Sequence, residues 1–393
     1  MKTLHKSPTD PAFVQAPYDF YDQARASGPL FFWAEYDKVC AVSYDAVAAG
    51  LRDRRFGREA PAGFAPAIPD HLAPFYAVET HSMLELEAPR HTRLRGLVMR
   101  AFTSRRIKAL APEIAQLSHE LMDALPAGEF DLLQEFAQKL PVIIIARLLG
   151  VPEEMAPQLL RWSNAMVSMY QAGRSREVED AAVTATEDFV AFMRGYVESR
   201  RNSPRDDLIS ELIAAEEAGE KLSTDELITT CILLLNAGHE ATVHAIGNGV
   251  KTLLDHGMGA GVLGADTLDS CVEELLRYDP PLHMFDRYAN EDFDFFGHSF
   301  KRGDKISLLL GAANRDPETW DEAHRFDPMR RIRANSSFGA GIHFCIGAPL
   351  ARLELKTALP ILFERLPELK LARPPEFANN YHFHGLSALW LRA

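Results

Sequence analysis

The chain has 393 residues, 47% of them hydrophobic and 25% charged, so it can bury a large core and has no disorder signature. Its formal net charge of −13 argues against nucleic-acid binding, because phosphate recognition needs clustered lysine and arginine. The N-terminal residues show no apolar stretch after their lysines, and no run approaches about 18 apolar residues, so we expect neither a signal peptide nor a membrane anchor. The four cysteines form no CxxC pair, which is typical of a reducing compartment and predicts a cytoplasmic protein.

Strand patterns lie towards the two ends of the chain. Residues 29–43 (GPLFFWAEYDKVCAV) predict a hairpin, and a second is predicted at 293–310, where FDFFG and KISLLL flank a glycine-rich turn. Most of 95–277 follows a periodicity of about 3.6 residues and is predicted to be helical. No repeat or linker interrupts the sequence. We therefore expect a mainly α fold with a minor β portion, in a single domain spanning 1–393.

One stretch is basic although the chain as a whole is acidic. Its six cationic residues are Arg93, Arg95, Arg100, Arg105, Arg106 and Lys108. Such a run is usually a solvated helix face, and the alternative is a docking surface for an acidic partner.

A long helix is predicted from the residues that begin and end it. Ser223 and Glu226 form a capping box, in which Ser223 is the N-cap residue. The apolar pattern continues to about Asp255, and Gly257 suits the position just after the helix. At about 1.5 Å per residue this helix is roughly 45 Å long, which is enough to cross a whole domain. We expect it to be the buried central helix.

The segment 338–347 (FGAGIHFCIG) is a glycine-rich loop that delivers Cys345 to the start of a helix, with Pro349 in the first turn. The N–H groups and dipole at that helix start favour a negatively charged sulfur, so Cys345 should have thiolate character. The residues alone leave three alternatives open: a buried structural cysteine, a nucleophile with His343 as base, or a zinc ligand. Adjacent spacing rarely builds a cysteine–histidine pair, and the other zinc ligands are missing.

This loop resembles the haem loop of the cytochrome P450 family, Phe-Gly-x-Gly-x-His/Arg-x-Cys-x-Gly, at every fixed position. The resemblance implies that Cys345 is the metal ligand, bound as thiolate to the iron of haem b, and that Phe338 and Gly339 belong to the cofactor site. It covers nearly the whole chain, because the other matching segments follow in family order. The implied architecture is the cytochrome P450 fold, with the long central helix over the haem.

Two further segments resemble family motifs of charged residues behind the haem loop. Glu274 and Arg277 match the family's Glu-x-x-Arg, and Arg330 ends a segment, FDPMR, that matches Phe-x-Pro-x-Arg. A charged pair at this spacing on a helix is common by itself. In the context of the resemblance, we expect a structural role for all three residues.

A third segment, 87–95 (EAPRHTRLR), resembles the family's Asp-Pro-Pro-x-His-Thr-Arg-x-Arg, with Glu-Ala in place of Asp-Pro. The resemblance implies that His91 and Arg95 face the haem propionates, as do Arg287 and His343. Arginine and histidine suit such anionic groups. Read singly, each of the four would more often be a surface charge or a core histidine.

The middle of the central helix, 237–242 (AGHEAT), contains the candidate catalytic residues Glu240, Ala241 and Thr242. A glutamate in an apolar helix is costly to bury unless it is partnered or functional. The segment resembles the family's Ala-Gly-x-Glu/Asp-Thr-Thr, in which an acid and an alcohol pass protons to dioxygen. Glu240 matches the acid, but Ala241 occupies the alcohol position. Thr242 lies about 100° further round the helix and should not replace it directly, so a water or a substrate hydroxyl is expected to supply the missing hydrogen bond.

The substrate pocket is assigned by position in the family pattern. The expected lining residues are Leu233, Asn236, Ala237, Met166, Met169, His283, Met284, Phe285 and Phe383. Methionine and phenylalanine at such positions are more often plain core. Asn236 is the most informative of them, because it could bond either a polar substrate atom or a kinked backbone.

The resemblance implies a monooxygenase that inserts one oxygen atom from dioxygen into a small or medium organic substrate. Electrons are expected from NAD(P)H through a separate ferredoxin and its reductase. The ferredoxin would dock on Arg100, Arg105, Arg106 and Lys108 of a chain expected to be monomeric. The alternatives are a haem-thiolate peroxygenase, an oxidase performing desaturation or coupling, and a haem sensor without turnover.

Overall fold

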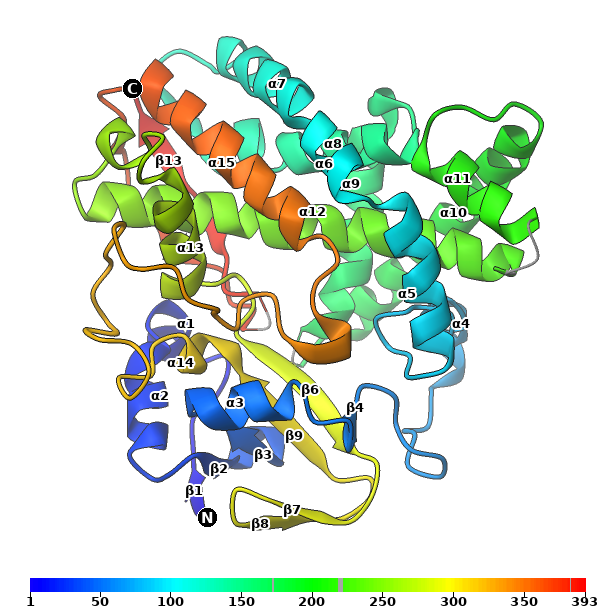
Figure 1. Ribbon diagram of the computed structural model, residues 1–393, viewed down its shortest axis with the longest axis vertical. Coiled ribbons are helices and arrows are strands. Elements are labelled where there is room, and N and C mark those ends of the chain that lie inside the picture. The colour runs from blue at the N-terminus through cyan, green and yellow to red at the C-terminus, as the bar shows by residue number, and fades with distance from the viewer. Residues whose placement is uncertain (172, 218–221, 382) are drawn as a thin grey trace.

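The computed structural model describes residues 1–171, 173–217, 222–381 and 383–393. Helices make up most of the molecule, and the main sheet lies with the N-terminal segment at one end (Figure 1). The helices are α1 (Pro11–Gln15), α2 (Tyr18–Arg25), α3 (Tyr44–Gly50), α4 (Ala73–Glu79), α5 (Arg90–Ala101), α6 (Ser104–Ala109), α7 (Ala111–Asp123), α8 (Lys139–Leu149), α9 (Ala156–Val167), α10 (Arg176–Arg201), α11 (Leu208–Glu217), α12 (Thr224–Asp255), α13 (Leu268–Tyr278), α14 (Leu310–Ala313) and α15 (Ala348–Arg365). The predicted fold class, mainly α with a minor β portion, is confirmed.

Among the described residues, no helix combines the length and the apolar character that crossing a membrane requires.

The strands form one larger sheet and three small ones. They are β1 (Lys2–Leu4), β2 (Leu30–Trp33), β3 (Lys38–Ala41), β4 (Phe56–Gly57), β5 (Glu129–Asp131), β6 (Met284–Ala289), β7 (Phe293–Phe295), β8 (His298–Phe300), β9 (Lys305–Leu309), β10 (Lys370–Leu371), β11 (Glu376–Phe377), β12 (Leu386–Ala388) and β13 (Trp390–Arg392). The larger sheet has the order β1-β2-β3-β9-β6-β4. The first predicted hairpin is confirmed, because β2 and β3 pair antiparallel with Leu30 opposite Ala41.

The second predicted hairpin is wrong in its pairing. β7 pairs with β8 through a two-residue turn at Phe296 and Gly297, whose φ angles of 47° and 78° suit a type I′ turn. The KISLL segment is β9, which lies between β3 and β6 in the larger sheet. All but the first residue of β9 are buried, as expected for an interior strand rather than one arm of an exposed hairpin.

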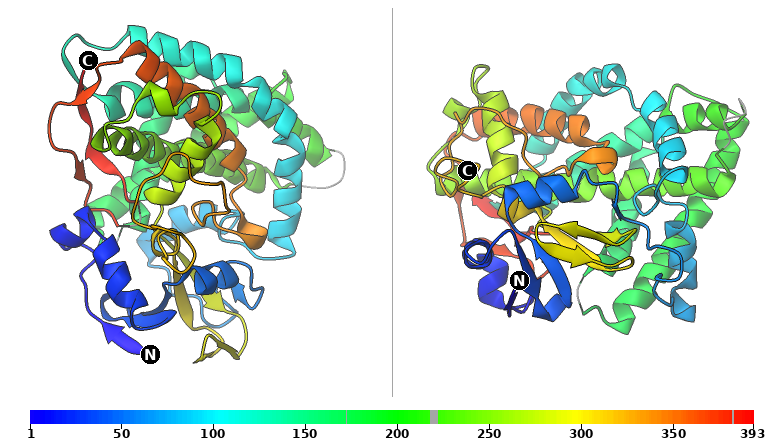
Figure 2. Two further views of the ribbon diagram at one scale, coloured as in Figure 1. Left: turned by 60° about the vertical axis from the view of Figure 1, so that its left-hand side comes forward. Right: turned by 60° about the horizontal axis from the view of Figure 1, so that its bottom comes forward.

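Helix α12 runs through the interior of the molecule, as predicted (Figures 1 and 2). Ser223 caps it, and its side chain and that of Glu226 form both hydrogen bonds of the capping box. The helix ends at Asp255, and Gly257 follows with a φ of 62°, in the left-handed conformation typical of a helix C-terminus. The largest core cluster packs around this helix and joins residues of α7, α8, α9, α10, α13 and α15. The helix therefore forms a fixed wall on which a site can be built.

Candidate active site

The loop before α15 has a backbone conformation that requires glycine. Gly339 and Gly341 have φ angles of 67° and 69°, which only glycine adopts readily. A side chain at Gly341 would also meet the carbonyl oxygen of Leu51, since its Cβ would lie 2.5 Å away. The N–H of Cys345 donates to the carbonyl oxygen of Phe338 at 3.0 Å and closes the loop. These constraints place Cys345 three residues before the first residue of α15.

Cys345 differs from the other three cysteines of the chain in its surroundings. All four are free thiols, and only Cys345 is exposed. Burial raises the pKa of both Cys231 and Cys271 to about 12, which makes them inert structural thiols. Partial desolvation also raises the pKa of Cys345, but the N–H groups of Gly347 and Ala348 and two nearby guanidinium groups oppose this effect. Cys345 is therefore the accessible sulfur of the chain, and it has N–H and guanidinium groups placed to stabilise its anionic form.

The alternatives for Cys345 find little support. A buried structural cysteine would not leave its side chain exposed. His343 directs Nε2 to the carboxylate oxygen Oε1 of Glu87 at 2.9 Å instead of serving as a base for the thiol. Among the described residues, the group able to offer three metal ligands consists of Asp279, His283 and His384 and does not include Cys345.

The residues expected to face the haem propionates gather around this loop. The rings of His91 and His343 lie 4.3 Å apart, and Nη2 of Arg95 donates to the carbonyl oxygen of Phe344 at 2.6 Å. Arg287 on β6 lies near Glu87, which also accepts the hydrogen bond from His343. The structure thus brings together side chains from α5, β6 and the cysteine loop.

This group of side chains suits an anionic ligand. Burial, His343 and Arg95 lower the pKa of His91 to about 4, and burial and Arg58 lower that of Arg287 to about 10. The buried Nδ1 of His91 has no hydrogen-bond partner among the described residues. Carboxylates placed here would offset the excess of positive charge and accept the unused hydrogen bonds. The residues present therefore fit the two propionates of a haem.

Sequence reasoning missed two members of this group. The carboxylate of Glu87 accepts hydrogen bonds from His343 and, at 2.7 Å, from the backbone N–H of Arg58. The Arg58 guanidinium forms an ion pair with Glu85. Glu87 is the first residue of the segment that resembles the family motif. An acid at that position could have indicated that Glu87 belongs to this group. Nothing in the local pattern around Arg58 indicated its place.

The expected structural residues form one buried charged cluster. Nε and Nη2 of Arg277 donate to the two carboxylate oxygens of Glu274 at 2.7 and 2.8 Å. Nε of Arg330 donates to the same two oxygens at 3.1 Å, and the N–H of Asp327 donates to Oε1 at 2.9 Å. Glu274 and Arg277 are each 1% exposed. A carboxylate with this many donors holds α13 to the segment before the cysteine loop.

One side of α12 keeps accessible surface although most of the helix is buried. Leu233, Asn236, Ala237, Glu240 and Ala241 retain this surface, and their spacing of three and four residues places them along one side. Between them, Leu234, Leu235 and His239 are buried. Such a stripe in the middle of a buried helix indicates an internal hollow. Helix α12 also contacts α15, which follows the cysteine loop.

Glu240 and Thr242 differ in their position relative to this stripe. The Glu240 carboxylate lies between two imidazoles, with Oε1 3.3 Å from His244 Nε2 and Oε2 3.5 Å from His239 Nε2. Burial alone would raise the pKa of Glu240, but the two histidines hold it well below its usual range. Thr242 is 4% exposed, and its hydroxyl lies 3.5 Å from the carbonyl oxygen of Gly238. The structure therefore does not bring the Thr242 hydroxyl to the accessible side, and the expected catalytic role of Thr242 is corrected on this ground.

The other expected pocket residues come from several elements, and one of them contacts Asn236. Nδ2 of Asn236 is 3.5 Å from Sδ of Met166, and its buried Oδ1 has no partner among the described residues. Met169 follows α9 in a short 3-10 turn and is buried. Phe383 lies with its ring 5.9 Å from that of His244, and Phe285 packs beside Gly339. Their contact with a substrate remains a prediction.

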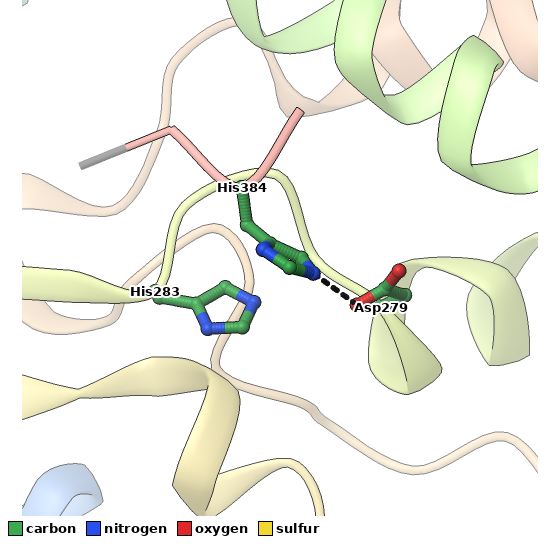
Figure 3. Close-up of side chains that lie close together, drawn as sticks. All are labelled: Asp279, His283 and His384. Carbon is green, nitrogen blue, oxygen red and sulfur yellow. Dashed lines mark ion pairs between the residues drawn. The ribbon is translucent and has the colours of Figure 1, made fainter. Parts of the chain in front are cut away.

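The structure places His283 and Met284 elsewhere. His283 is fully buried, where Nδ1 bonds the hydroxyl of Tyr21 at 2.8 Å and Nε2 points towards Asp279 and His384 (Figure 3). Met284 packs in an aromatic cluster on the face of β6 opposite to Phe285 and Arg287. These two assignments to the pocket are therefore corrected: they followed position in the family pattern, which does not fix the direction of a side chain.

The basic stretch is only partly available for docking. Arg106 forms ion pairs with Asp206 at 3.0 Å and with Glu211. Arg105 and Lys108 are exposed on α6, and Arg100 is exposed near the end of α5. The two acids that neutralise Arg106 leave Arg105 and Lys108 as the better candidates.

Comparisons with known proteins agree with this geometry. Residues 266–379 match the family model Cytochrome P450. Polyketide biosynthesis cytochrome P450 PksS of Bacillus subtilis (strain 168) is 37% identical over 404 residues, with 99% of this chain and 98% of the relative covered. Cytochrome P450 monooxygenase PikC of Streptomyces venezuelae is 38% identical, with coverages of 97% and 92%. The solved structure of P450BioI, in complex with hexadec-9Z-enoic acid ligated acyl carrier protein, matches with a TM-score of 0.90 and 34% identity, over 97% of this chain and 99% of that chain.

Proposed function

The chain belongs to the cytochrome P450 family of monooxygenases, and we propose that it inserts one oxygen atom from dioxygen into a small or medium organic substrate. The observation that carries the proposal is the exposed thiol of Cys345 at the start of α15, beside histidine and arginine side chains that fit two carboxylates. The family implies a haem cofactor, which supplies the chemistry that activates dioxygen. Dioxygen and NAD(P)H-derived electrons are the proposed co-substrates.

The chain's own residues would hold and orient this cofactor. Cys345 would bind the iron through its sulfur, with the N–H groups of Gly347 and Ala348 stabilising the negative charge. His91, Arg95, Arg287 and His343 would bind the propionates, and Phe338 and Gly339 would shape the loop that carries the ligand. The Glu240 carboxylate on α12, together with the histidines that flank it, would deliver a proton at the accessible side, where the substrate binds.

We propose a mostly apolar substrate with at least one polar group. Leu233, Ala237 and Phe285 offer apolar surface, and Oδ1 of Asn236, which has no partner within the described part of the chain, can accept one hydrogen bond. The relatives' names mention polyketide biosynthesis and a fatty acid on a carrier protein, so an acyl or polyketide-type molecule is the class to test first. Titration with hexadec-9Z-enoic acid should shift the Soret band, and Asn236→Leu should weaken a ligand that uses the amide.

Electrons would come from NAD(P)H through a separate ferredoxin and reductase, and Arg105 and Lys108 would form the docking surface. All four cysteines are free thiols, which suits a cytoplasmic enzyme, and we propose that the chain acts as a monomer with one domain.

The test is a reconstituted reaction under ¹⁸O₂ with a surrogate ferredoxin, its reductase and NADPH. One labelled oxygen atom in the product supports the proposal. A product formed only with added hydrogen peroxide would instead favour the peroxygenase, and an unlabelled desaturated or coupled product would favour the oxidase. Ala241 is the reason to test the peroxygenase and the oxidase, because it offers no hydroxyl at the proton-delivery position. If the protein consumed neither NADPH nor peroxide, the haem sensor without turnover would be favoured.

A further inference from the structure

His239 precedes Glu240 on α12, and one of its two ring nitrogens is already hydrogen-bonded to the backbone. Its Nδ1 lies 2.9 Å from the carbonyl oxygen of Leu235. A carbonyl oxygen only accepts, so Nδ1 must carry a hydrogen. In a neutral ring the lone pair would then be on Nε2, which lies 3.5 Å from Oε2 of Glu240. A lone pair facing an ionised carboxylate in this buried position is repulsive, so one additional proton should lie between Nε2 and Oε2.

His244 approaches the same carboxylate from one helical turn further on. Its Nε2 lies 3.3 Å from Oε1 of Glu240, whereas its buried Nδ1 has no partner among the described residues. A hydrogen on Nδ1 would be left unbonded, so the favoured form of His244 is neutral with its hydrogen on Nε2, donating to Glu240. The three groups together then bear no net charge: an imidazolium at His239, a carboxylate at Glu240 and a neutral ring at His244.

The C-terminal segment leaves room for the His244 ring. A Cβ on Gly385 would lie 1.9 Å from Nδ1 of His244, so any side chain there would displace the ring. The φ of Gly385 is not in the left-handed region, so space rather than backbone conformation requires glycine. The ring of Phe383 lies 5.9 Å from that of His244. The segment around Gly385 and Phe383 thus packs against the His244 ring, whose Nε2 faces Glu240.

We propose that His239, Glu240 and His244 form a proton-holding cluster that compensates for the missing hydroxyl at Ala241. The inference rests on the proposed function. Glu240 is the group on the accessible side that delivers the proton, and the two histidines are positioning residues: His239 shares the proton with it, and His244 orients it. Residues 241 and 244 are three apart and share one side of the helix, which puts the His244 N–H near the position that an alcohol would occupy.

The proton transfer balances without another reactant. The cluster releases one proton to an acceptor in the hollow, and this leaves a neutral His239 with a lone pair facing the carboxylate. Because this state is unfavourable, the cluster takes a proton back from a hydronium ion of the bulk solvent, which leaves neutral water. The electrons for the reduction of dioxygen come from the NAD(P)H–ferredoxin chain already proposed.

The first test determines which ring nitrogens of His239 and His244 carry a hydrogen. In the ferrous–carbon monoxide holoenzyme, which is diamagnetic, ¹⁵N NMR of labelled histidine rings should show both nitrogens of His239 protonated and His244 protonated at Nε2. His256 is the internal reference, because its Nδ1 also bonds the carbonyl four residues back, that of Thr252, at 2.8 Å. In Glu240→Gln the second proton of His239 should be lost. A wild-type His239 without a hydrogen on Nε2 would overturn the inference. A carbon monoxide complex without the thiolate band would instead overturn the proposed function.

The second test needs no native substrate. Peroxyphenylacetic acid gives phenylacetic acid when its O–O bond breaks heterolytically, with a proton supplied, and benzyl products when the bond breaks homolytically. His244→Leu and Gly385→Ala should each lower the heterolytic-to-homolytic ratio by about tenfold, which is less than the roughly hundredfold or larger effect of a positioned acid because Glu240 itself remains. His244→Gln, whose amide can still donate to Glu240, should recover much of the ratio, and the control His256→Gln should leave it unchanged. Wild-type ratios in both His244→Leu and Gly385→Ala, with the thiolate band intact, would contradict the role of His244.

Discussion

Arg277 should be among the most costly side chains to remove from this protein. It is 1% exposed and donates to both carboxylate oxygens of Glu274. Its Nη1 also donates to the carbonyl oxygens of Asn314 at 2.7 Å and Ala323 at 2.9 Å. In Arg277→Met these carbonyl groups lose a donor, and among the described residues Glu274 keeps Arg330 and the N–H of Asp327 as donors.

The magnitude follows from what remains buried. Removing one partner of a buried ion pair leaves an incompletely compensated charge and costs about 3–5 kcal/mol. Against a typical unfolding free energy of about 5–15 kcal/mol, this is at least about a fifth of the total. Arg330 keeps the loss below that of an isolated carboxylate, because it still donates to both oxygens of Glu274.

Urea unfolding, followed by circular dichroism on the holoenzyme, measures this loss. The matched control is Arg176→Met on α10, where the ion pair with Asp180 joins two mostly exposed side chains. That control should change the unfolding free energy by less than about 1 kcal/mol. A loss of under about 1 kcal/mol in Arg277→Met would refute the view that this buried cluster holds α13 in place.

Three other predictions concern docking, coupling and a buried acid. Arg105→Glu combined with Lys108→Glu should slow ferredoxin-driven reduction several-fold at low ionic strength while leaving dithionite reduction intact. Equal stopped-flow rates of ferredoxin-driven reduction in wild type and variant would contradict the proposed docking surface. Ala241→Thr should raise the product formed per NADPH if water alone supplies the missing hydrogen bond, and should lower it together with substrate affinity if the substrate's own hydroxyl does; Glu240→Gln with unchanged coupling would exclude Glu240 from proton delivery. Burial raises the pKa of Glu354 well above its usual range, and its two carboxylate oxygens have no partner among the described residues. The acid is therefore neutral when folded but ionised when unfolded above a pH of about 4.3, so wild-type stability should fall as the pH rises, and Glu354→Gln should gain about 1–3 kcal/mol at pH 8 in urea unfolding, a gain that should shrink towards pH 4.

Local signals predicted the features that local chemistry determines. The capping box at Ser223 and the glycine at 257 mark the two ends of α12, because each depends on neighbours within one helical turn. The cysteine loop was predictable for the same reason, since its glycines are required by its own backbone conformation. The role of His244 could also have been inferred, because it lies four residues after Glu240.

Contacts between distant segments were not readable from the sequence. Arg106 is neutralised by Asp206, which lies a hundred positions later in the chain. His283 turns towards Tyr21 and Asp279, and a Cβ on Gly311 would lie 2.8 Å from its ring, so residues from several elements decide its direction. The pairing of β7 with β8 instead of β9 likewise depends on β9 being buried between two other strands. In each case tertiary packing determined what the local pattern left open.

The central claim is that Cys345 binds the haem iron as a thiolate, and the ferrous–carbon monoxide spectrum of Cys345→Ser tests it most directly. The wild-type protein should show the red-shifted Soret band that thiolate ligation produces. The serine variant should fold, as judged by circular dichroism, and lack that band, because its hydroxyl cannot replace the sulfur donor. A folded variant that retained the red-shifted band would show that another residue is the ligand and would contradict the account.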